Sequence, residues 1–176
     1  GSSTPAAPQL GDIVISELMI NPSAVEDKNG EWLEITNLTN KTLDLSGMIL
    51  SDDGVDLTTI EGSVQLDPRS YIVLCANDSG SLNGGITCAA QYHYASTGDG
   101  FAMANAEDEI MIAGPDGVLL DRVAYAPGFA PVGRSIGVRS EQLTPSGNDH
   151  QSAWCTQIGA LQGGDQGTPG AINSSC

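Results

Sequence analysis

Turn-forming residues divide this sequence into short apolar stretches, one roughly every 8 to 12 positions. Apolar residues at the 3.6-residue spacing of an α-helix never continue for as many as ten positions. Short strands joined by tight turns have this spacing, and about seven of them suffice for two packed sheets. The sequence therefore predicts an all-β protein, an immunoglobulin-like β-sandwich.

Individual strands can be placed by their β-branched and aromatic residues and by the turns that end them. The clearest hairpin joins residues 109–113 to residues 118–124 across the turn Gly114-Pro115-Asp116-Gly117. Gly47 is expected to form a bulge or a close backbone approach inside the strand at residues 43–50. The other predicted strands are residues 13–19, 31–37, 57–60, 63–66 and 71–75.

The chain is expected to form one domain. Residues 1–10 have the composition of a flexible linker or an expression remnant, and residues 11–176 make up the domain. Its core strands are predicted at about 11–125, with a long irregular loop from residue 76 to about 100. Residues 126–176 contain prolines and glycines with hardly any periodicity, which predicts an extended tail lying on the domain.

The charge of the chain excludes several classes of partner. Its 22 acidic and 6 basic side chains give a formal net charge of -16, and 40% of its residues are hydrophobic, enough for a folded core. Binding to a nucleic-acid backbone needs clustered lysines and arginines, so no nucleic-acid partner is expected. An acidic surface is also repelled by anionic lipids, and no apolar run is long enough for membrane insertion.

The four cysteines are Cys75, Cys88, Cys155 and Cys176, and the sequence does not choose among their three possible pairings. Local pairing is the simplest, joining Cys75 to Cys88 and Cys155 to Cys176. A zinc site is the alternative, but there is no Cys-x-x-Cys pair and no histidine at a recognised ligand spacing. Disulfides would place the protein outside the cytoplasm, extracellular or at the cell surface, with the periplasm as a further compartment.

Five stretches of the chain carry a resemblance when they are taken in order, at residues 13–18, 30–37, 43–47, 66–74 and 116–121. Together they resemble the lamin tail domain family, in its bacterial secreted type. They cover about residues 11 to 125, with the similar ending Gly-Thr-Pro-Gly-Ala-Ile-Asn at residues 167–173. The resemblance implies an immunoglobulin-like β-sandwich that serves as an accessory module of secreted enzymes or is displayed at cell surfaces. The nucleic-acid binding of nuclear members is not implied, because this chain is acidic.

A set of oxygen-bearing side chains suggests a metal site. If the first two strands pair, some of these oxygens could meet near the loop between them, and Ca²⁺ takes about 6–8 oxygen ligands. The alternative is a polar strand face or a polar network with the backbone. No cofactor is required by the sequence, and Ca²⁺ is the one that it suggests. The candidate metal ligands are Glu17, Asn21, Asp27, Glu31, Glu34 and Asp165.

Tyr92 and Tyr94 would lie on one face of a strand and could form a platform for carbohydrate, unless the core claims them. Catalysis has little support, since His93 and His150 are the only histidines and neither lies in a known catalytic motif. We therefore expect a non-catalytic extracellular interaction or attachment module whose partner is a protein or a polysaccharide. The alternatives are a calcium- or carbohydrate-binding module and, with the weakest support, a hydrolase.

Overall fold

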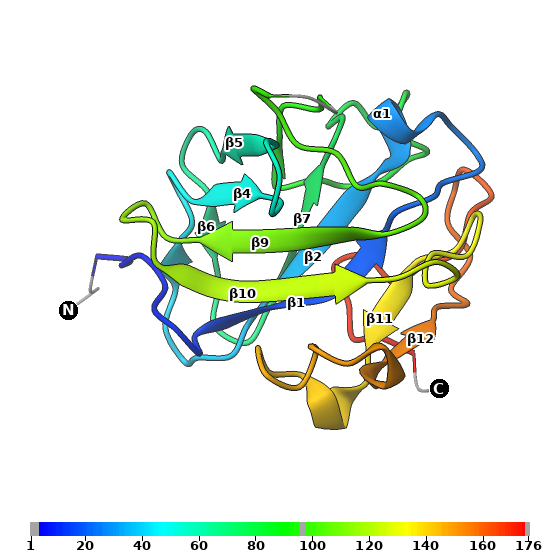
Figure 1. Ribbon diagram of the computed structural model, residues 1–176. Coiled ribbons are helices and arrows are strands. Elements are labelled where there is room, and N and C mark those ends of the chain that lie inside the picture. Colours follow the sequence, from blue (N-terminus) through cyan, green and yellow to red (C-terminus); the bar gives the residue numbers. More distant parts are fainter. Residues whose placement is uncertain (1–3, 96–97, 175–176) are drawn as a thin grey trace.

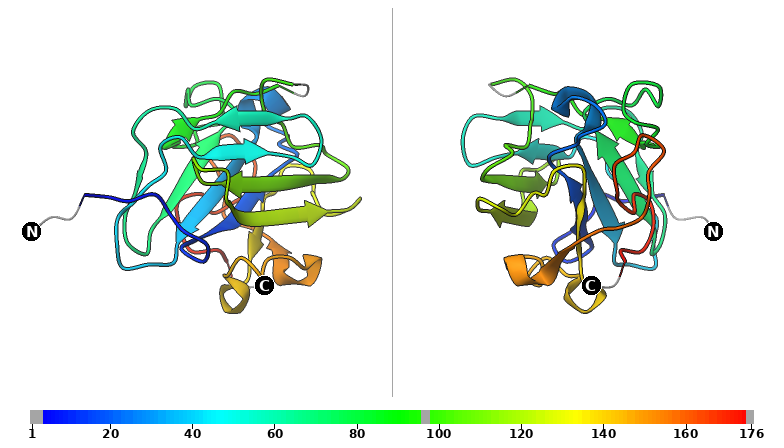
Figure 2. Two further views of the ribbon diagram at one scale, coloured as in Figure 1. Left: turned by 60° about the vertical axis from the view of Figure 1, so that its left-hand side comes forward. Right: turned by 90° about the vertical axis from the view of Figure 1, so that its right-hand side faces the viewer.

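The computed structural model describes residues 4–95 and 98–174. Two antiparallel sheets pack face to face, as the sequence predicts for a sandwich (Figures 1 and 2). The larger sheet has the strand order β12-β11-β1-β2-β7-β8, in which only β7 and β8 run parallel. Its strands are β1 (Ile13–Met19), β2 (Trp32–Asn37), β7 (Tyr71–Cys75), β8 (Ala90–Gln91), β11 (Ile136–Val138) and β12 (Trp154–Thr156).

The smaller sheet has the order β10-β9-β4-β5, and a two-stranded sheet of β3 and β6 lies at one end. A short helix, α1, precedes β2, and two 3₁₀ helices span Ser140–Gln142 and Gln151–Ala153. No helix among the described residues is long and apolar enough to cross a membrane. The remaining bounds are α1 (Asp27–Gly30), β3 (Leu43–Asp44), β4 (Ile49–Ser51), β5 (Leu57–Thr59), β6 (Gln65–Leu66), β9 (Asp108–Ala113) and β10 (Leu119–Tyr125).

A β-bulge in β1 explains why its apolar pattern alternates only loosely. The register against β2 shifts between Ile15 and Glu17. Ile15 and Leu18 therefore both belong to the core between the sheets, whereas Glu17 and Met19 point to the other face. The Ile15 N–H at the bulge donates instead to Asp121 Oδ2, at 2.7 Å. Asp121 thus satisfies a backbone group that would otherwise be buried without a partner.

The outer face of the larger sheet is covered as well. The loop after β7 and the C-terminal segment lie over it and enclose a second apolar cluster that includes Met19, Trp32 and Ile86. Every residue of β1 and β2 is consequently buried. The prediction of a disulfide between Cys75 and Cys88 is confirmed, with a Cα–Cα distance of 5.9 Å. The second predicted bond, from Cys155 to Cys176, ends outside the described residues.

The structure corrects two of the predicted elements. Residues 43–50 are not one strand, because Gly47, with φ at +76°, turns the chain from β3 in one sheet to β4 in another. Residues 126–176 are not only an extended tail, because they supply β11 and β12 to the edge of the larger sheet. Each of these strands has three residues, too few to show a periodicity of their own. β11 pairs with β1, and β12 pairs with β11, so the larger sheet stabilises both strands.

Candidate functional site

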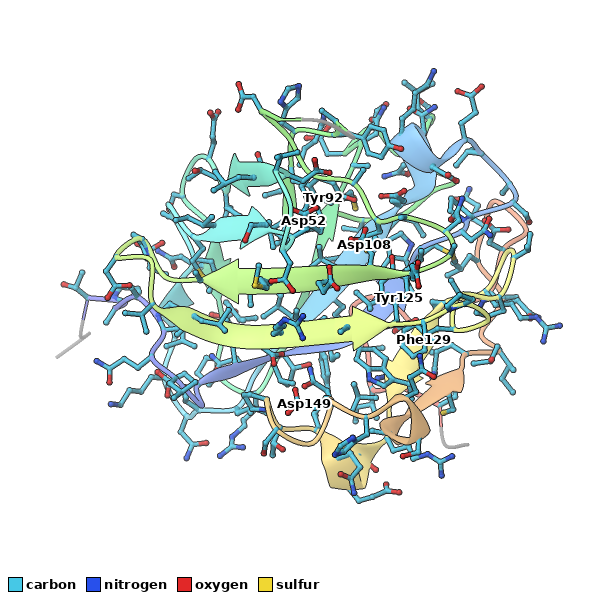
Figure 3. The ribbon with its side chains drawn as sticks, viewed as in Figure 1. Asp52, Tyr92, Asp108, Tyr125, Phe129 and Asp149 are labelled. Atoms are coloured by element: carbon cyan, nitrogen blue, oxygen red, sulfur yellow. A yellow bond between two sulfur atoms is a disulfide. The ribbon has the colours of Figure 1, made fainter. Side chains whose placement is uncertain are left out.

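An acidic groove of about 420 Å³ opens at the end of the sandwich, between α1, the turn joining β4 to β5, and the segment that leads into β9. Five of its lining residues are acids, and two of these, Asp52 and Asp108, are labelled in Figure 3 beside β4 and β9. None of its lining residues is basic. The lining acids are Asp27, Glu31, Asp52, Asp56 and Asp108, and the other lining residues are Gly54, Val55, Tyr94, Ala102, Met103, Ala104 and Asn105.

Backbone and amide N–H groups hold these carboxylates in place. Asp52 Oδ1 accepts hydrogen bonds from the N–H groups of Gly54 and Asp56, both at 2.9 Å. Asp108 Oδ2 accepts from the Ala104 N–H at 2.7 Å, and Asp27 Oδ2 accepts from the Asn105 side chain at 2.9 Å. These donors are neutral, so they orient the carboxylates and leave the negative charge uncompensated.

Glu31 is the most deeply placed of the five acids. Its side chain is 1% exposed, and its Oε2 accepts a hydrogen bond of 3.0 Å from the Met103 N–H. Burial, helped by the nearby charges of Asp27 and Asp108, raises the pKa of Glu31 to about 9. Burial also raises the pKa of Asp56, with Asp52 and Asp108 adding to the effect.

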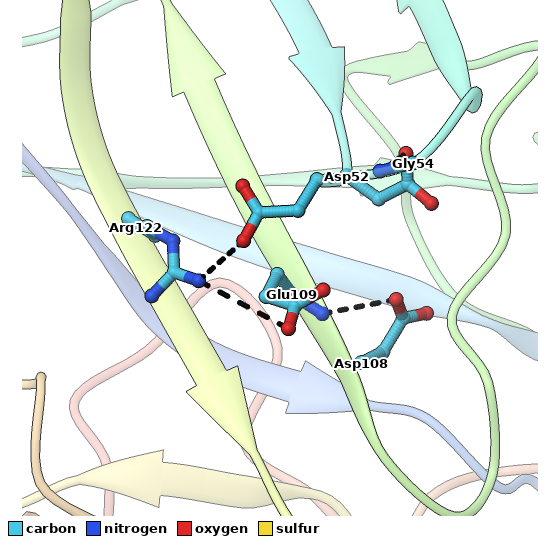
Figure 4. Close-up of polar contacts among 6 residues, drawn as sticks. Asp52, Gly54, Asp108, Glu109 and Arg122 are labelled. Carbon is cyan, nitrogen blue, oxygen red and sulfur yellow. Dashed lines mark hydrogen bonds and ion pairs between the residues drawn. The ribbon is translucent and has the colours of Figure 1, made fainter.

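The positive side chains near the groove are bound to other acids. Arg122 on β10 lies near Glu109 (Figure 4), at 4.0 Å, and 2.7 Å from Asp53. Lys28 pairs with Glu26. In the part of the chain that the structure describes, no ion pair includes a carboxylate that lines the groove. The groove is therefore a negative surface without an internal counter-charge, suited to a cationic ligand.

The six predicted metal ligands lie in three separate places. Asp27 and Glu31 line the groove, and Glu17 and Glu34 face each other under the C-terminal segment. Asp165 instead accepts hydrogen bonds from the Ser23 hydroxyl and the neighbouring backbone, close to the loop that contains Asn21. Among the described residues, no group of three or more His, Cys, Asp or Glu side chains could hold a metal ion. Calcium binding itself stays a prediction.

The predicted tyrosine platform is not formed. Tyr92 is 1% exposed and packs edge-on against Phe101 in the core, with 5.6 Å between the ring centroids. Burial alternates along this segment, with Gln91 and His93 exposed and both tyrosines turned inward, so the tyrosines do share a side but the core covers it. Tyr94 is partly exposed and lines the acidic groove.

Asp52, Asp56 and Asp108 are three of the five acids in the groove, and the sequence favours a solvated turn at each of them, with weak cation binding as the alternative. Asp52 and Asp56 lie in one acidic turn, and Asp108 lies in another that follows about 50 residues later in the sequence. The pairing of β4 with β9, with Ser51 opposite Met111, brings these turns together. The hydroxyl of Tyr125, which Figure 3 labels, donates to the Ala104 carbonyl at 2.7 Å and holds the segment before β9. The only signal in the sequence was that several acidic turns occur in one strongly acidic chain.

Comparison with known proteins adds a family assignment. A protein-family model described as Lamin Tail Domain matches residues 6–127. No curated protein matches the chain. The matched region includes all residues that line the acidic groove and ends before β11.

Proposed function

Because the chain belongs to the lamin tail domain family, we propose that it is a non-catalytic interaction module that binds a basic segment of a partner protein in its acidic groove. The Cys75–Cys88 disulfide indicates an oxidising compartment, which supports an extracellular or cell-surface location. The observation that carries the proposal is a groove lined by five acids and by no basic residue. Among the described residues, Asp27, Asp52, Asp56 and Asp108 take part in no ion pair, whereas the buried Glu31 holds its proton near neutral pH.

The arrangement of these carboxylates favours a polypeptide over a single metal ion. Ca²⁺ needs its oxygen ligands to converge at about 2.3–2.6 Å, whereas the groove distributes its charges over several segments. Several lysines or arginines along a peptide can pair with carboxylates that are spaced apart in this way. Tyr94 can contact a cationic head group, and Val55, which is 70% exposed at the groove, can contact the aliphatic part of a lysine or arginine side chain.

The proposal predicts that a fluorescein-labelled octalysine peptide binds the protein and that Asp27→Asn with Asp52→Asn weakens this binding. Asparagine retains the side-chain oxygen that accepts hydrogen bonds at both positions, so the loops keep their conformation. Each exposed charge pair contributes about 0.2–1 kcal/mol, so we expect the affinity for the peptide to fall three- to tenfold, on the order of 1 kcal/mol. Fluorescence anisotropy at low and high salt measures it.

The matched control is Glu61→Gln with Glu141→Gln, which removes the same charge at exposed positions outside the groove. An equal loss of affinity in this control would show that the peptide responds only to net charge and would refute the groove as the site. A calcium titration and a polysaccharide pull-down complete the test. Binding of Ca²⁺ or polysaccharide without binding of the peptide would replace the proposal with one of these ligands.

A further inference from the structure

The C-terminal segment returns over the outer face of the larger sheet as far as residue 174 (red in Figures 1 and 2). It lies beyond the region that matches the family. Under it, Glu17 on β1 and Glu34 on β2 are register partners in the sheet, and both are 0% exposed. Two carboxyl groups are thus buried side by side on one face of the sheet.

Both carboxyl groups bind the backbone of this segment. The Thr168 N–H donates to Glu17 Oε1 and the Thr168 hydroxyl to Glu17 Oε2, each at 2.7 Å. The Gly170 N–H donates to Glu34 Oε2, also at 2.7 Å. The Ser135 hydroxyl also donates to Glu17 Oε1, and the Ser16 hydroxyl donates to Glu34 Oε1. The segment is therefore recognised by its amides at two adjacent points.

The sequence of residues 167–173 fits this role position by position. A Cβ on Gly167 would lie 2.7 Å from Ser135 Oγ and 3.1 Å from Glu17 Oε1, so the close approach needs glycine. Gly170 has φ at +78°, the left-handed conformation that glycine adopts without strain. The Asn173 side chain donates to the carbonyls of Ser16 and Val138, at 2.8 and 3.0 Å, and so ties the segment to both β1 and β11.

Among the described residues, no ion pair includes Glu17 or Glu34. The titratable group that faces this pair from β7 is the Tyr71 phenol, and the groups that contact the pair from β11, its preceding loop and the C-terminal segment are hydroxyls and amides. Burial raises the pKa of Glu34 to about 8, and the neighbouring Glu17 adds to the effect. Burial also raises the pKa of Glu17. The pair therefore retains a proton near neutral pH.

We propose that residues 167–173 form a proton-dependent strap, closed while the Glu17–Glu34 pair carries a proton and loosened when both carboxyl groups are ionised. On loosening, the proton passes to solvent and two negative charges remain side by side under the strap. Their repulsion and their need for water favour the open form. Opening of the strap uncovers the outer face of the larger sheet. This opening does not involve the acidic groove.

Hydrogen–deuterium exchange of the intact protein tests the strap. The readout is the protection factor, corrected for the intrinsic exchange rate, of peptides covering residues 167–174 and of peptides covering β9 and β10. Between about pH 6 and about pH 9, we expect the strap to lose at least tenfold in protection, while β9 and β10 lose much less. Equal losses in both regions, or a strap whose protection does not change with pH, would overturn the proposal.

Glu17→Gln with Glu34→Gln gives a neutral version of the pair. The amide oxygens can accept from the Thr168 and Gly170 N–H groups, and the Thr168 hydroxyl can donate instead to Gln157 Oε1 or Asn173 Oδ1, each at 3.2 Å. This variant should stay protected at both pH values, whereas the exposed control Glu107→Gln should behave as wild type. A strap in the Gln variant that still opens with pH would contradict the role of the pair. If the variant does not fold, the pH series of the wild type decides.

Discussion

Replacement of Cys75 and Cys88 by alanine should lower the free energy of unfolding by about 3 kcal/mol, because the unfolded chain regains the entropy of an open loop of this length. The two cysteines are separated by 13 residues, and the bond fixes a loop with little regular structure. Urea unfolding without reductant, followed by tryptophan fluorescence, measures the change. Trp32 lies in the same apolar cluster as Cys75 and reports directly on it.

The loss in free energy of unfolding should be larger than this entropic contribution if the loop also releases its packing contacts. Ile86 packs with Met19 and Trp32, and the backbone at Gly84 lies against Gly163 of the C-terminal segment. The exposed Leu82→Ala is the matched control in the same loop and should change the free energy by less than about 0.5 kcal/mol. A double-alanine variant as stable as this control would show that packing and the Asn83 hydrogen bonds hold the loop without the disulfide.

The protein should be most stable in mild acid and lose stability as the pH rises from about 5 to about 9. Burial raises the pKa of Glu31 to about 9, of Glu34 to about 8 and of Asp121 to about 6, above the ordinary values of 4.5 for Glu and 3.8 for Asp. Between the ordinary and the raised values the folded protein holds protons that the unfolded chain releases. Raising the pH therefore favours unfolding. Since one pKa unit is about 1.4 kcal/mol, the loss is on the order of several kcal/mol.

Urea unfolding at a series of pH values measures this dependence, and Glu31→Gln isolates its largest contribution. The glutamine oxygen can still accept from the Met103 N–H, whereas no proton is lost on unfolding. The variant should therefore show a flatter decline between about pH 5 and 9. The exposed Glu107→Gln corrects for the change in surface charge. A wild-type stability that rises over this range would mean that Glu31 and Glu34 are already ionised in the folded protein.

Local features of the fold could be predicted from the sequence. The turn at residues 114–117 and the apolar residues on both sides of it are contiguous in the chain, so the hairpin of β9 and β10 was predicted closely. The Cys75–Cys88 bond was predicted for the same reason, since it closes a short loop. The break at Gly47 was not predicted, because a single glycine within a strand-like stretch fits a bulge as well as a crossing between sheets.

The candidate site could be predicted only in part. The sequence singled out Asp27 and Glu31, and it placed Glu17 and Glu34 with them because the first two strands were expected to pair. The strands do pair, but Glu31 precedes β2 and lies in the groove, while Glu34 lies within the strand. Tyr92 was predicted to lie on a surface because a period-2 pattern does not tell which face of a strand other parts of the chain cover.

The sequence by itself determined the β-sandwich, its central strands and its acidic character, because periodicity, turn propensity and charge are properties of neighbouring residues. Only the tertiary structure decided which polar groups are buried and which meet. Glu17 and Glu34 are buried by residues that follow them by more than 130 positions, and the groove joins acids from α1, the β4–β5 turn and β9. Such contacts depend on how distant segments pack, and no local pattern encodes them.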